Sequence, residues 1–333
     1  MIVSGHLLYA EPIKVSGLLL VGDPHVSSKR PGRRKDATWP DPILRKLEFC
    51  VETANARGLA MLLLGDLFDE SLEEDEALKT RVSRILKAAV IPPIANVGNH
   101  DKANAKLSDC DSLSFLAVND ALDVIRDSGP VCTFDIDGML LGLGMTPYGQ
   151  DIPTDVTGQF EGVNAVMWCT HHDIAFDETY PKAVHPFPIA GCKIVVNGHV
   201  HARKKPVRAG ETMWLNPGNI NRQSVDLIDH VPAAWVLDGR SNFEPVELPH
   251  GVDVFDLTGR LVDPSTPEEV AASVESAFVT ILKAQESIDS VASDDGAMIR
   301  EDIEAKFERD KTPTDIRAII NSLLSEAISR RAA

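Results

Sequence analysis

Short clusters of aspartate, asparagine and histidine recur along this chain, and their side chains are ligands that divalent metal ions accept. The first cluster is Asp23-x-His25. Four more follow in order: Gly65-Asp66-Leu67-Phe68-Asp69, Gly98-Asn99-His100-Asp101, Thr170-His171-His172 and Gly198-His199-Val200-His201. Oxygen and imidazole ligands of this kind suit Mn²⁺, Fe²⁺ and Zn²⁺. One such cluster arises easily by chance, but their combination predicts a metal site.

Each cluster begins within a residue or two of the end of a short apolar run. The runs are residues 15–21, 59–64, 94–97, 163–169 and 192–196. Apolar runs of this length are typical of strands that are buried on both faces of a sheet. In α/β proteins the chemically active side chains gather beyond the carboxyl ends of such strands. We therefore expect the loops that carry the clusters to converge in one site.

The elements around these strands predict a layered α/β domain. A strand is expected over residues 1–10, and helices over residues 42–57, 73–89 and 112–121, the first of them ended by Gly58. From residue 131 onward short strands predominate, at 131–136, 139–145, 163–169, 194–196, 212–215, 233–237 and 243–247. This pattern favours two packed β-sheets flanked by helices, in an α/β domain that covers residues 1–259.

The remaining residues, 260–333, are predicted to form an acidic helical extension. Two apolar stripes occur at helical spacing, one between Val270 and Leu282 and one between Ile316 and Ile328. These stripes must be covered, either by each other and the catalytic domain or by a partner. The sequence is compatible with both arrangements.

Composition bounds the class of protein. The chain has 333 residues, of which 44% are hydrophobic, so it can bury a substantial core. No apolar run approaches the about 20 residues that a membrane helix needs. The five cysteines are widely spaced and contain no Cys-x-x-Cys pair, which indicates reduced thiols. We expect a cytoplasmic protein without a membrane anchor.

Charge is distributed unevenly around the metal clusters. The net charge of −17 argues against indiscriminate binding of nucleic acid. However, one basic cluster at residues 29–35 follows Asp23-x-His25 directly, and another at residues 203–208 follows His201. Both are expected to be loops, and together they favour a polyanionic substrate. The candidate substrate contacts are Arg30, Arg33, Arg34 and Arg203.

The cluster Gly98-Asn99-His100-Asp101 suggests a division of roles between metal binding and catalysis. Asn99 offers a carbonyl oxygen to a metal ion, whereas His100 offers an imidazole that is free to act on the substrate. Asp101 is expected to hold the tautomer of His100. Farther along, Asn216-Pro217-Gly218-Asn219 is a turn sequence followed by Arg222, a candidate phosphate contact.

The five clusters, taken in this order from Asp23 to His201, resemble the calcineurin-like metallophosphoesterase superfamily. Two of them, Gly65-Asp66-Leu67-Phe68-Asp69 and Gly198-His199-Val200-His201 preceded by Asn197, look most like the SbcD-type DNA repair nucleases. The resemblance implies a four-layer fold with two packed mixed β-sheets flanked by helices, a two-metal site and hydrolysis of phosphoester bonds.

Ligand roles follow from this resemblance position by position. It implies one metal ion bound by Asp23, His25, Asp66 and His201, and a second bound by Asp66, Asn99, His171 and His199. Asp66 would bridge the two ions. His171 is chosen because the family ligand is the first residue past the strand end, and His172 is the alternative. Asp69 stands where some nuclease relatives have a histidine, so it is expected to support His100 or a metal ligand.

The leading hypothesis is a two-metal phosphodiesterase that acts as a DNA exo- or endonuclease, with Mn²⁺ as the expected ion and Fe²⁺, Zn²⁺ or Mg²⁺ as alternatives. The expected partners are nucleic acid, DNA more than RNA, and either a second copy of this chain or a coiled-coil ATPase bound by the helical extension. The alternative enzyme is a phosphatase or phosphodiesterase for a small molecule or a phosphoprotein. A non-catalytic scaffold is a third interpretation, although no ligand position is missing.

Overall fold

The computed structural model describes residues 7, 9–177, 183–240 and 242–257. The chain divides into two compact units, Met1–Val254 and Phe255–Ala333. The described residues belong almost entirely to the first unit. The predicted helical extension at 260–333 lies outside them, as does most of the strand predicted over 1–10, so these two remain predictions. So does the domain boundary at residue 259.

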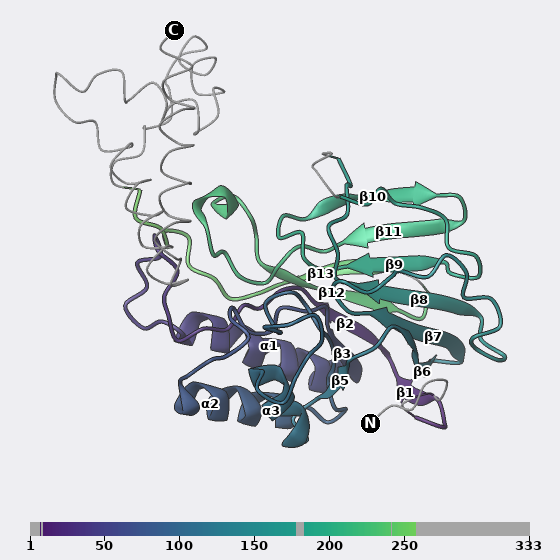
Figure 1. Ribbon diagram of the computed structural model, residues 1–333, viewed down its shortest axis with the longest axis horizontal. Coiled ribbons are helices and arrows are strands. Elements are labelled where there is room, and N and C mark those ends of the chain that lie inside the picture. The colour runs from purple at the N-terminus through teal and green to yellow at the C-terminus, as the bar shows by residue number, and fades with distance from the viewer. Residues whose placement is uncertain (1–6, 8, 178–182, 241, 258–333) are drawn as a thin grey trace, which may run out of the picture. The chain divides into compact units, whose positions relative to one another are not determined.

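Within the described residues, the first unit contains two mixed β-sheets (Figure 1). The seven-stranded sheet has the order β1 (Ile13–Val15), β6 (Gly129–Ile136), β7 (Met139–Thr146), β8 (Ala165–Thr170), β9 (Ile194–Asn197), β11 (Thr212–Asn216) and β10 (Lys204–Ala209). The six-stranded sheet has the order β13 (Phe243–Glu247), β12 (Ala233–Asp238), β2 (Gly17–Val21), β3 (Leu59–Leu63), β4 (Ile94–Asn96) and β5 (Asp123–Ile125).

Alternation along β2 shows how the layers are built. Leu18 and Leu20 belong to the core between the two sheets, which also contains Phe134 of β6 and Met167 of β8. Leu19 faces the other way, into the core beneath the helices. A strand with apolar residues on both faces can only be stable when both faces are covered. The fully apolar sequence of this strand therefore requires the layered arrangement.

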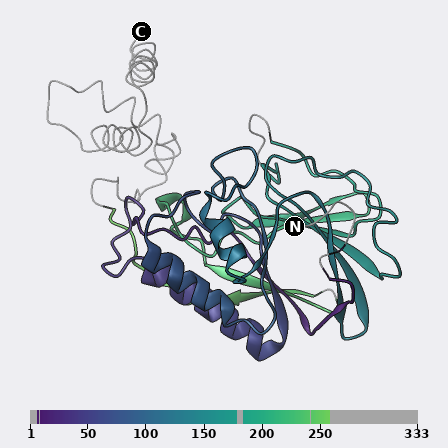
Figure 2. The same ribbon diagram turned by 60° about the horizontal axis from the view of Figure 1, so that its bottom comes forward.

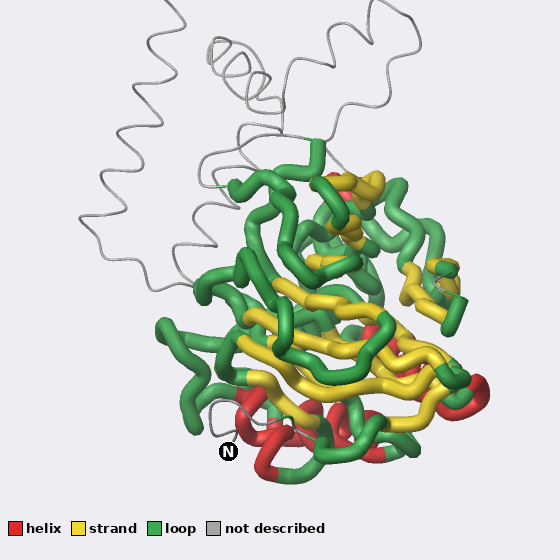
Figure 3. The backbone as a smooth tube through the Cα atoms, turned by 90° about the vertical axis from the view of Figure 1, so that its right-hand side faces the viewer, coloured by secondary structure: helices red, strands yellow, loops and turns green. Residues whose placement is uncertain are grey.

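Helices cover the outer face of the six-stranded sheet in the described part of the chain. They are α1 (Asp41–Arg57), α2 (Glu76–Lys87) and α3 (Ser112–Val118), and they lie together on one side (Figures 1 and 2). Loops cover the outer face of the seven-stranded sheet (Figure 3), where Phe160 and Ile174 pack on Trp168 and Trp214. The predicted two-sheet α/β fold is confirmed, with loops rather than helices in this outermost layer.

The helix boundaries follow from local chemistry. The expected end of α1 is confirmed, because Gly58 adopts the left-handed conformation at φ 64° and its N–H bonds back to the last turn. Helix α2 begins at Glu76, later than predicted, because the side chain of Asp75 accepts a hydrogen bond from the backbone N–H of Leu78 at 3.0 Å. This N-cap fixes where the helix can start.

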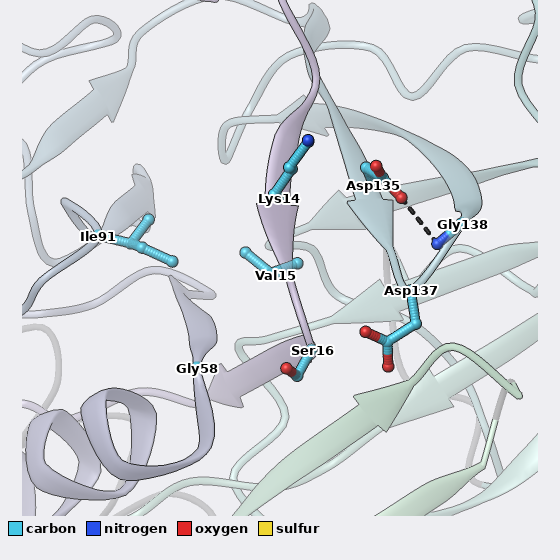
Figure 4. Close-up of a pocket in the computed structure, with 8 residues that line it drawn as sticks. All are labelled: Lys14, Val15, Ser16, Gly58, Ile91, Asp135, Asp137 and Gly138. Atoms are coloured by element: carbon cyan, nitrogen blue, oxygen red, sulfur yellow. Dashed lines mark hydrogen bonds between the residues drawn. The ribbon is translucent and has the colours of Figure 1, made fainter.

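The run predicted as one strand at 15–21 is two strands in different sheets. β1 pairs with β6, whereas β2 pairs with β3 and β12. Ser16 lies at the crossing point, and its backbone N–H donates to the carbonyl oxygen of Gly58 at 2.8 Å. A surface pocket of about 380 Å³ opens at this crossing (Figure 4). It lies at the opposite end of β2 from Asp23.

Two further strands differ from the sequence expectations. β5 lies in a stretch for which no strand was predicted. β10 occupies the basic segment that we expected to be a loop, and it pairs with β11 at the edge of the seven-stranded sheet. Its lysines and arginines lack the apolar alternation that reveals a strand, and edge strands commonly carry such charges. No helix in the described residues is long and apolar enough to cross a membrane.

The C-cap of α1 yields a test of this fold. Gly58→Ala should lower the free energy of unfolding by about 1 to 2 kcal/mol, because a Cβ atom is strained in the left-handed conformation. Gly32→Ala is the matched control, since a Cβ atom there meets no neighbour within 4 Å. Urea unfolding followed by tryptophan fluorescence measures both. Equal losses in the two variants would contradict the assigned cap.

Candidate metal centre

The seven predicted metal ligands lie at strand ends in both sheets. Asp23 and His25 follow β2, Asp66 follows β3 and Asn99 follows β4, all in the six-stranded sheet. His171 follows β8, and His199 and His201 follow β9, in the seven-stranded sheet. Since β2, β3 and β4 are parallel to one another, as β8 is to β9, each set of loops meets at one edge of its sheet. The packed sheets bring the two edges together.

One group of ligands centres on His25. Its Nε2 atom lies 2.9 Å from Nε2 of His201 and 3.7 Å from Oδ2 of Asp66. Ligand atoms of Asp23, His25 and Asp66 all lie within 4.8 Å of one another. Imidazole nitrogens and carboxylate oxygens that converge in this way form a donor set for a divalent ion.

A second group shares Asp66 with the first. Its Oδ2 atom lies 3.1 Å from Nε2 of His171, and ligand atoms of Asp66, His171 and His199 lie within 4.8 Å of one another. Nδ1 of His199 is 2.9 Å from Oδ1 of Asn99, so these two predicted ligands also meet. The Oδ2 atom of Asp66 therefore faces both groups, as a bridging ligand must.

Backbone N–H groups hold the other oxygen of each carboxylate. Oδ1 of Asp66 accepts a hydrogen bond from the backbone of His100 at 2.8 Å, and Oδ1 of Asp23 accepts one from His199 at 2.9 Å. Oδ2 of Asp23 and Nε2 of His171 are buried and have no hydrogen-bond partner among the described residues. Buried polar atoms without partners are costly. Divalent metal ions would satisfy these atoms, so the residues fit two such ions.

The ligand loops adopt a strained backbone. Asp23, His25, Asp66 and His199 have φ values of 38°, 46°, 49° and 69°. Side chains other than glycine rarely occupy this left-handed region, and strain of this kind clusters at functional sites. Gly98 lies close to these loops and must lack a side chain, since a Cβ atom there would collide with the carboxylate of Asp66.

Electrostatics ties the carboxylates to the imidazoles. Burial would lower the pKa of His171, but the neighbouring carboxylates of Asp66 and Asp23 outweigh it and raise that pKa to about 9. Burial would also raise the pKa of Asp66, but His171 and His25 hold it well below its usual range. By contrast, burial and the adjacent His25 lower the pKa of His201 to about 4. A metal ion that binds His171 and Asp66 must therefore displace the proton that His171 holds.

The two consecutive histidines point to different partners. His171 is fully buried beside Asp66, and its Nδ1 atom lies 3.0 Å from the carbonyl oxygen of Leu64. Nε2 of His172 instead donates to the carbonyl oxygen of Gln150 at 2.8 Å. The structure thus brings His171, and not His172, into the ligand groups.

His100 is held differently from the sequence expectation. Its Nδ1 atom donates to the backbone carbonyl oxygen of Asp69 at 2.6 Å, and its exposed ring lies edge-on to His25. Asp101, which we expected to orient His100, is fully buried and accepts hydrogen bonds from the backbone of Gly98 and Phe68. Asp101 therefore shapes the loop, because its carboxylate is engaged by backbone N–H groups.

Asp69 supports both neighbours with different atoms. Its carbonyl oxygen fixes His100, while its Oδ1 atom lies 3.3 Å from Nδ1 of His25 and accepts a hydrogen bond from Gln223 at 2.9 Å. This carboxylate also contributes to the raised pKa of His25, against the effect of burial. The prediction that Asp69 supports His100 or a metal ligand thus has a contact for each role.

Two of the candidate substrate arginines are buried in structural positions. The guanidinium of Arg34 pairs with Asp36 at 2.6 Å and donates to the carbonyl oxygen of Arg222 at 2.7 Å. The guanidinium of Arg222 donates to the carbonyl oxygens of Ile228 and Gly251. Both arginines therefore hold loops together, contrary to the expected contacts with substrate.

The other candidate arginines are more accessible. Arg30 is exposed and donates to the carbonyl oxygen of Asp36, and Arg33 is half-buried. Arg203 is exposed and stacks over the ring of Trp235, with 4.2 Å between the guanidinium carbon and the ring centroid. These three side chains remain candidates for contact with a substrate.

Sequence reasoning missed Asp173, which contacts a predicted ligand. Its Oδ1 atom lies 3.0 Å from Nε2 of His199, on the opposite side of the ring from Asn99, and its Oδ2 atom accepts from the hydroxyl of Tyr148 at 3.5 Å. A carboxylate in this position fixes the tautomer of a metal-binding imidazole. Its place after Thr170-His171-His172, at a strand end, was the available signal.

This contact predicts an effect on metal binding. Asp173→Ala should weaken divalent metal affinity by about 10- to 100-fold, because His199 loses the partner that orients its ring. Asp177→Ala is the control, since Asp177 pairs with Lys204 on the surface. Isothermal titration with Mn²⁺ measures both variants. Unchanged affinity in Asp173→Ala would remove this role.

Comparisons with known proteins complete the description of the site. The sequence profile of the calcineurin-like phosphoesterase family matches residues 17–203, which contain all seven predicted ligands. A comparison with curated proteins gave no match. A crystal structure of a 5'-nucleotidase precursor from Thermus thermophilus aligns at 12% sequence identity and a TM-score of 0.42, over 70% of this chain. The alignment covers 54% of that protein, so the chain spans about half of its length. Because the family match covers more than half of the sequence, the chain belongs to the calcineurin-like phosphoesterase family.

Proposed function

We propose that this chain hydrolyses phosphodiester bonds with two divalent metal ions, Mn²⁺ first among them, and that it is a DNA exo- or endonuclease of the SbcD-like type. The observation that carries the two-metal part is the position of Asp66, whose Oδ2 atom faces His25 on one side and His171 on the other. The membership of the family supports metal-dependent hydrolysis of phosphoesters. Nuclease activity is tested separately, by a charge reversal on β10.

The bound ions would lower the pKa of a water ligand and neutralise the phosphate oxygens. The chain's own contribution is to hold the ligands and to supply a proton donor. Because Nδ1 of His100 donates to the carbonyl oxygen of Asp69, its Nε2 atom is the one that can exchange a proton with the substrate. The ring is exposed, which supports a role for it in contact with substrate. The proposed role of His100 is therefore to protonate the leaving oxygen.

This role separates His100 from the metal ligands. His100→Asn should reduce kcat by about 10² to 10⁴ while leaving the metal content unchanged, because removal of a proton donor affects the chemical step alone. His199→Ala is the comparison, and it should lose metal together with activity. Elemental analysis and turnover of a small phosphoester are measured on the same samples. Loss of metal in His100→Asn would show that His100 is a ligand.

Nucleic acid as substrate is supported by the edge strand β10. It begins shortly after His201 and exposes Lys205 and Arg208, a basic edge that could follow a phosphate backbone. The basic cluster at residues 29–35 has less unpaired positive charge for a phosphate backbone, because Lys29 pairs with Glu70 at 2.8 Å and Lys35 with Asp253 at 2.6 Å. The support for a polyanionic substrate therefore rests mainly on β10.

Hydrolysis of a small phosphoester is the second candidate function. It is favoured by those same ion pairs, which neutralise much of the basic cluster at 29–35, and by the net charge of −17. A small substrate needs only the metal ions and a few nearby contacts. The two functions differ in whether charge outside the metal centre affects turnover.

A charge reversal on β10 distinguishes the two substrates. Lys205→Glu should raise KM for DNA and reduce its dependence on salt, by a slope of about 0.9 for each phosphate that the protein no longer neutralises, but leave p-nitrophenyl phosphate unaffected. Lys193→Glu is the matched control with the same change of charge, since Lys193 pairs with Glu211 at 3.3 Å on the surface. Turnover of the small ester without cleavage of single-stranded or duplex DNA would favour the second function.

A further inference from the structure

A buried lysine without a partner lies on the helix that covers the six-stranded sheet. Lys46 belongs to α1 and is 2% exposed. Its ammonium group has no hydrogen bond and no ion pair among the described residues. A buried charge is costly unless it is paired and hydrogen-bonded. The position of Lys46 therefore calls for a compensating group.

The surroundings of Lys46 make its charge less favourable still. Burial, together with the cationic Arg34 and Arg222, lowers the pKa of Lys46 to about 7. Asp36 acts in the opposite direction, but its carboxylate is already engaged with Nε of Arg34 at 2.6 Å. Lys46, Arg34 and Arg222 form a set that we term the buried basic cluster. It combines the two arginines expected to contact phosphate with a lysine that the sequence did not single out.

Unsatisfied polar atoms line the adjoining loop. Both side-chain amide atoms of Asn219 and of Asn221 are buried without a hydrogen-bond partner in the described residues, as is Nε of Arg222. Neither asparagine side chain is exposed. His230 connects this loop to the cluster, because its Nε2 atom donates to the carbonyl oxygen of Asn219 at 2.7 Å and its ring lies near Lys46 and Arg222. Each buried polar atom that lacks a hydrogen bond destabilises the fold.

The ammonium group of Lys46, Nε of Arg222 and the side-chain N–H groups of Asn219 and Asn221 are thus donors that have no acceptor among the described residues. Water could satisfy the amides, but it would leave the ammonium charge of Lys46 uncompensated. A tetrahedral oxyanion supplies both the negative charge and several acceptor oxygens, and guanidinium and ammonium groups are its usual partners in proteins.

We propose that the buried basic cluster binds a small oxyanion of the sulfate or phosphate class, held by Lys46, by Nε of Arg222 and by the side-chain amides of Asn219 and Asn221. This site is additional to the metal centre and uses none of the metal ligands. The loop connects the two through its backbone, because Asn219 donates to His201 and Ile220 donates to Gly22, both at 2.9 Å. The bound anion would stabilise the loop against the strand ends that carry the metal ligands.

Sulfate is the probe for this site, because it has the right shape and is not hydrolysed. The melting temperature of the metal-loaded full-length protein is followed at pH 6, where Lys46 is charged, while sulfate replaces chloride at constant ionic strength. We expect saturable stabilisation in the wild type. Lys46→Met should weaken the apparent affinity for sulfate at least tenfold, since it removes the charge and keeps the volume. Apolar substitution of a buried charge is commonly tolerated by the fold.

Lys79→Met is the matched control, since Lys79 is 7% exposed but already pairs with Glu76 at 2.7 Å. It should respond to sulfate as the wild type does. Asn221→Ala provides a second variant of the site if Lys46→Met unfolds, and it should also lose affinity. Asp66→Asn tests whether sulfate instead binds the metal ions, and the proposal expects its response to persist.

Three results would overturn the proposal. The first is a wild-type response that does not exceed that of chloride at equal ionic strength. The second is an unchanged response in both Lys46→Met and Asn221→Ala. The third is a response that disappears in Asp66→Asn but persists in Lys46→Met, because this would place the anion at the metal centre.

Discussion

The carboxylate of Asp66 is the contact on which the arrangement of this domain depends. A buried carboxylate needs partners on every side, and here they come from both sheets: His25 from the six-stranded sheet and His171 from the seven-stranded sheet. The backbone of His100 holds its other oxygen. Both sheets must therefore end their parallel strands at the same place, and Gly98 must lack a side chain so that the carboxylate fits.

Much of this could be predicted from the sequence, because the strands concerned are buried on both faces. Their runs of Leu, Val and Ile have no other stable location, and a polar cluster at the end of such a run marks a strand end. The end of α1 was predictable for a similarly local reason, since Gly58 is the residue that the left-handed C-cap favours. The gathering of the seven predicted metal ligands follows from these simple rules together with the resemblance to a family.

The features that the sequence did not predict depend on contacts between segments that are distant in the sequence. β10 is a strand because β11 pairs with it, and its charged sequence does not show this. The apolar run around Ser16 is shared between two sheets because β1, before Ser16, pairs with β6. Asp101 adjoins His100 in sequence, yet its carboxylate faces the backbone of Phe68 and Gly98. The carbonyl oxygen of Asp69 instead orients the ring of His100. Adjacency in sequence does not fix the direction of a side chain in a tight loop.

The left-handed backbone at Asp23, His25, Asp66 and His199 has a consequence for the history of such a domain. Glycine is the residue that these four φ values favour, so exchange of any of them for glycine would relieve local strain. A copy of this chain released from selection for catalysis could therefore lose its ligands and become more stable in the same step. Stability and activity oppose each other at these positions.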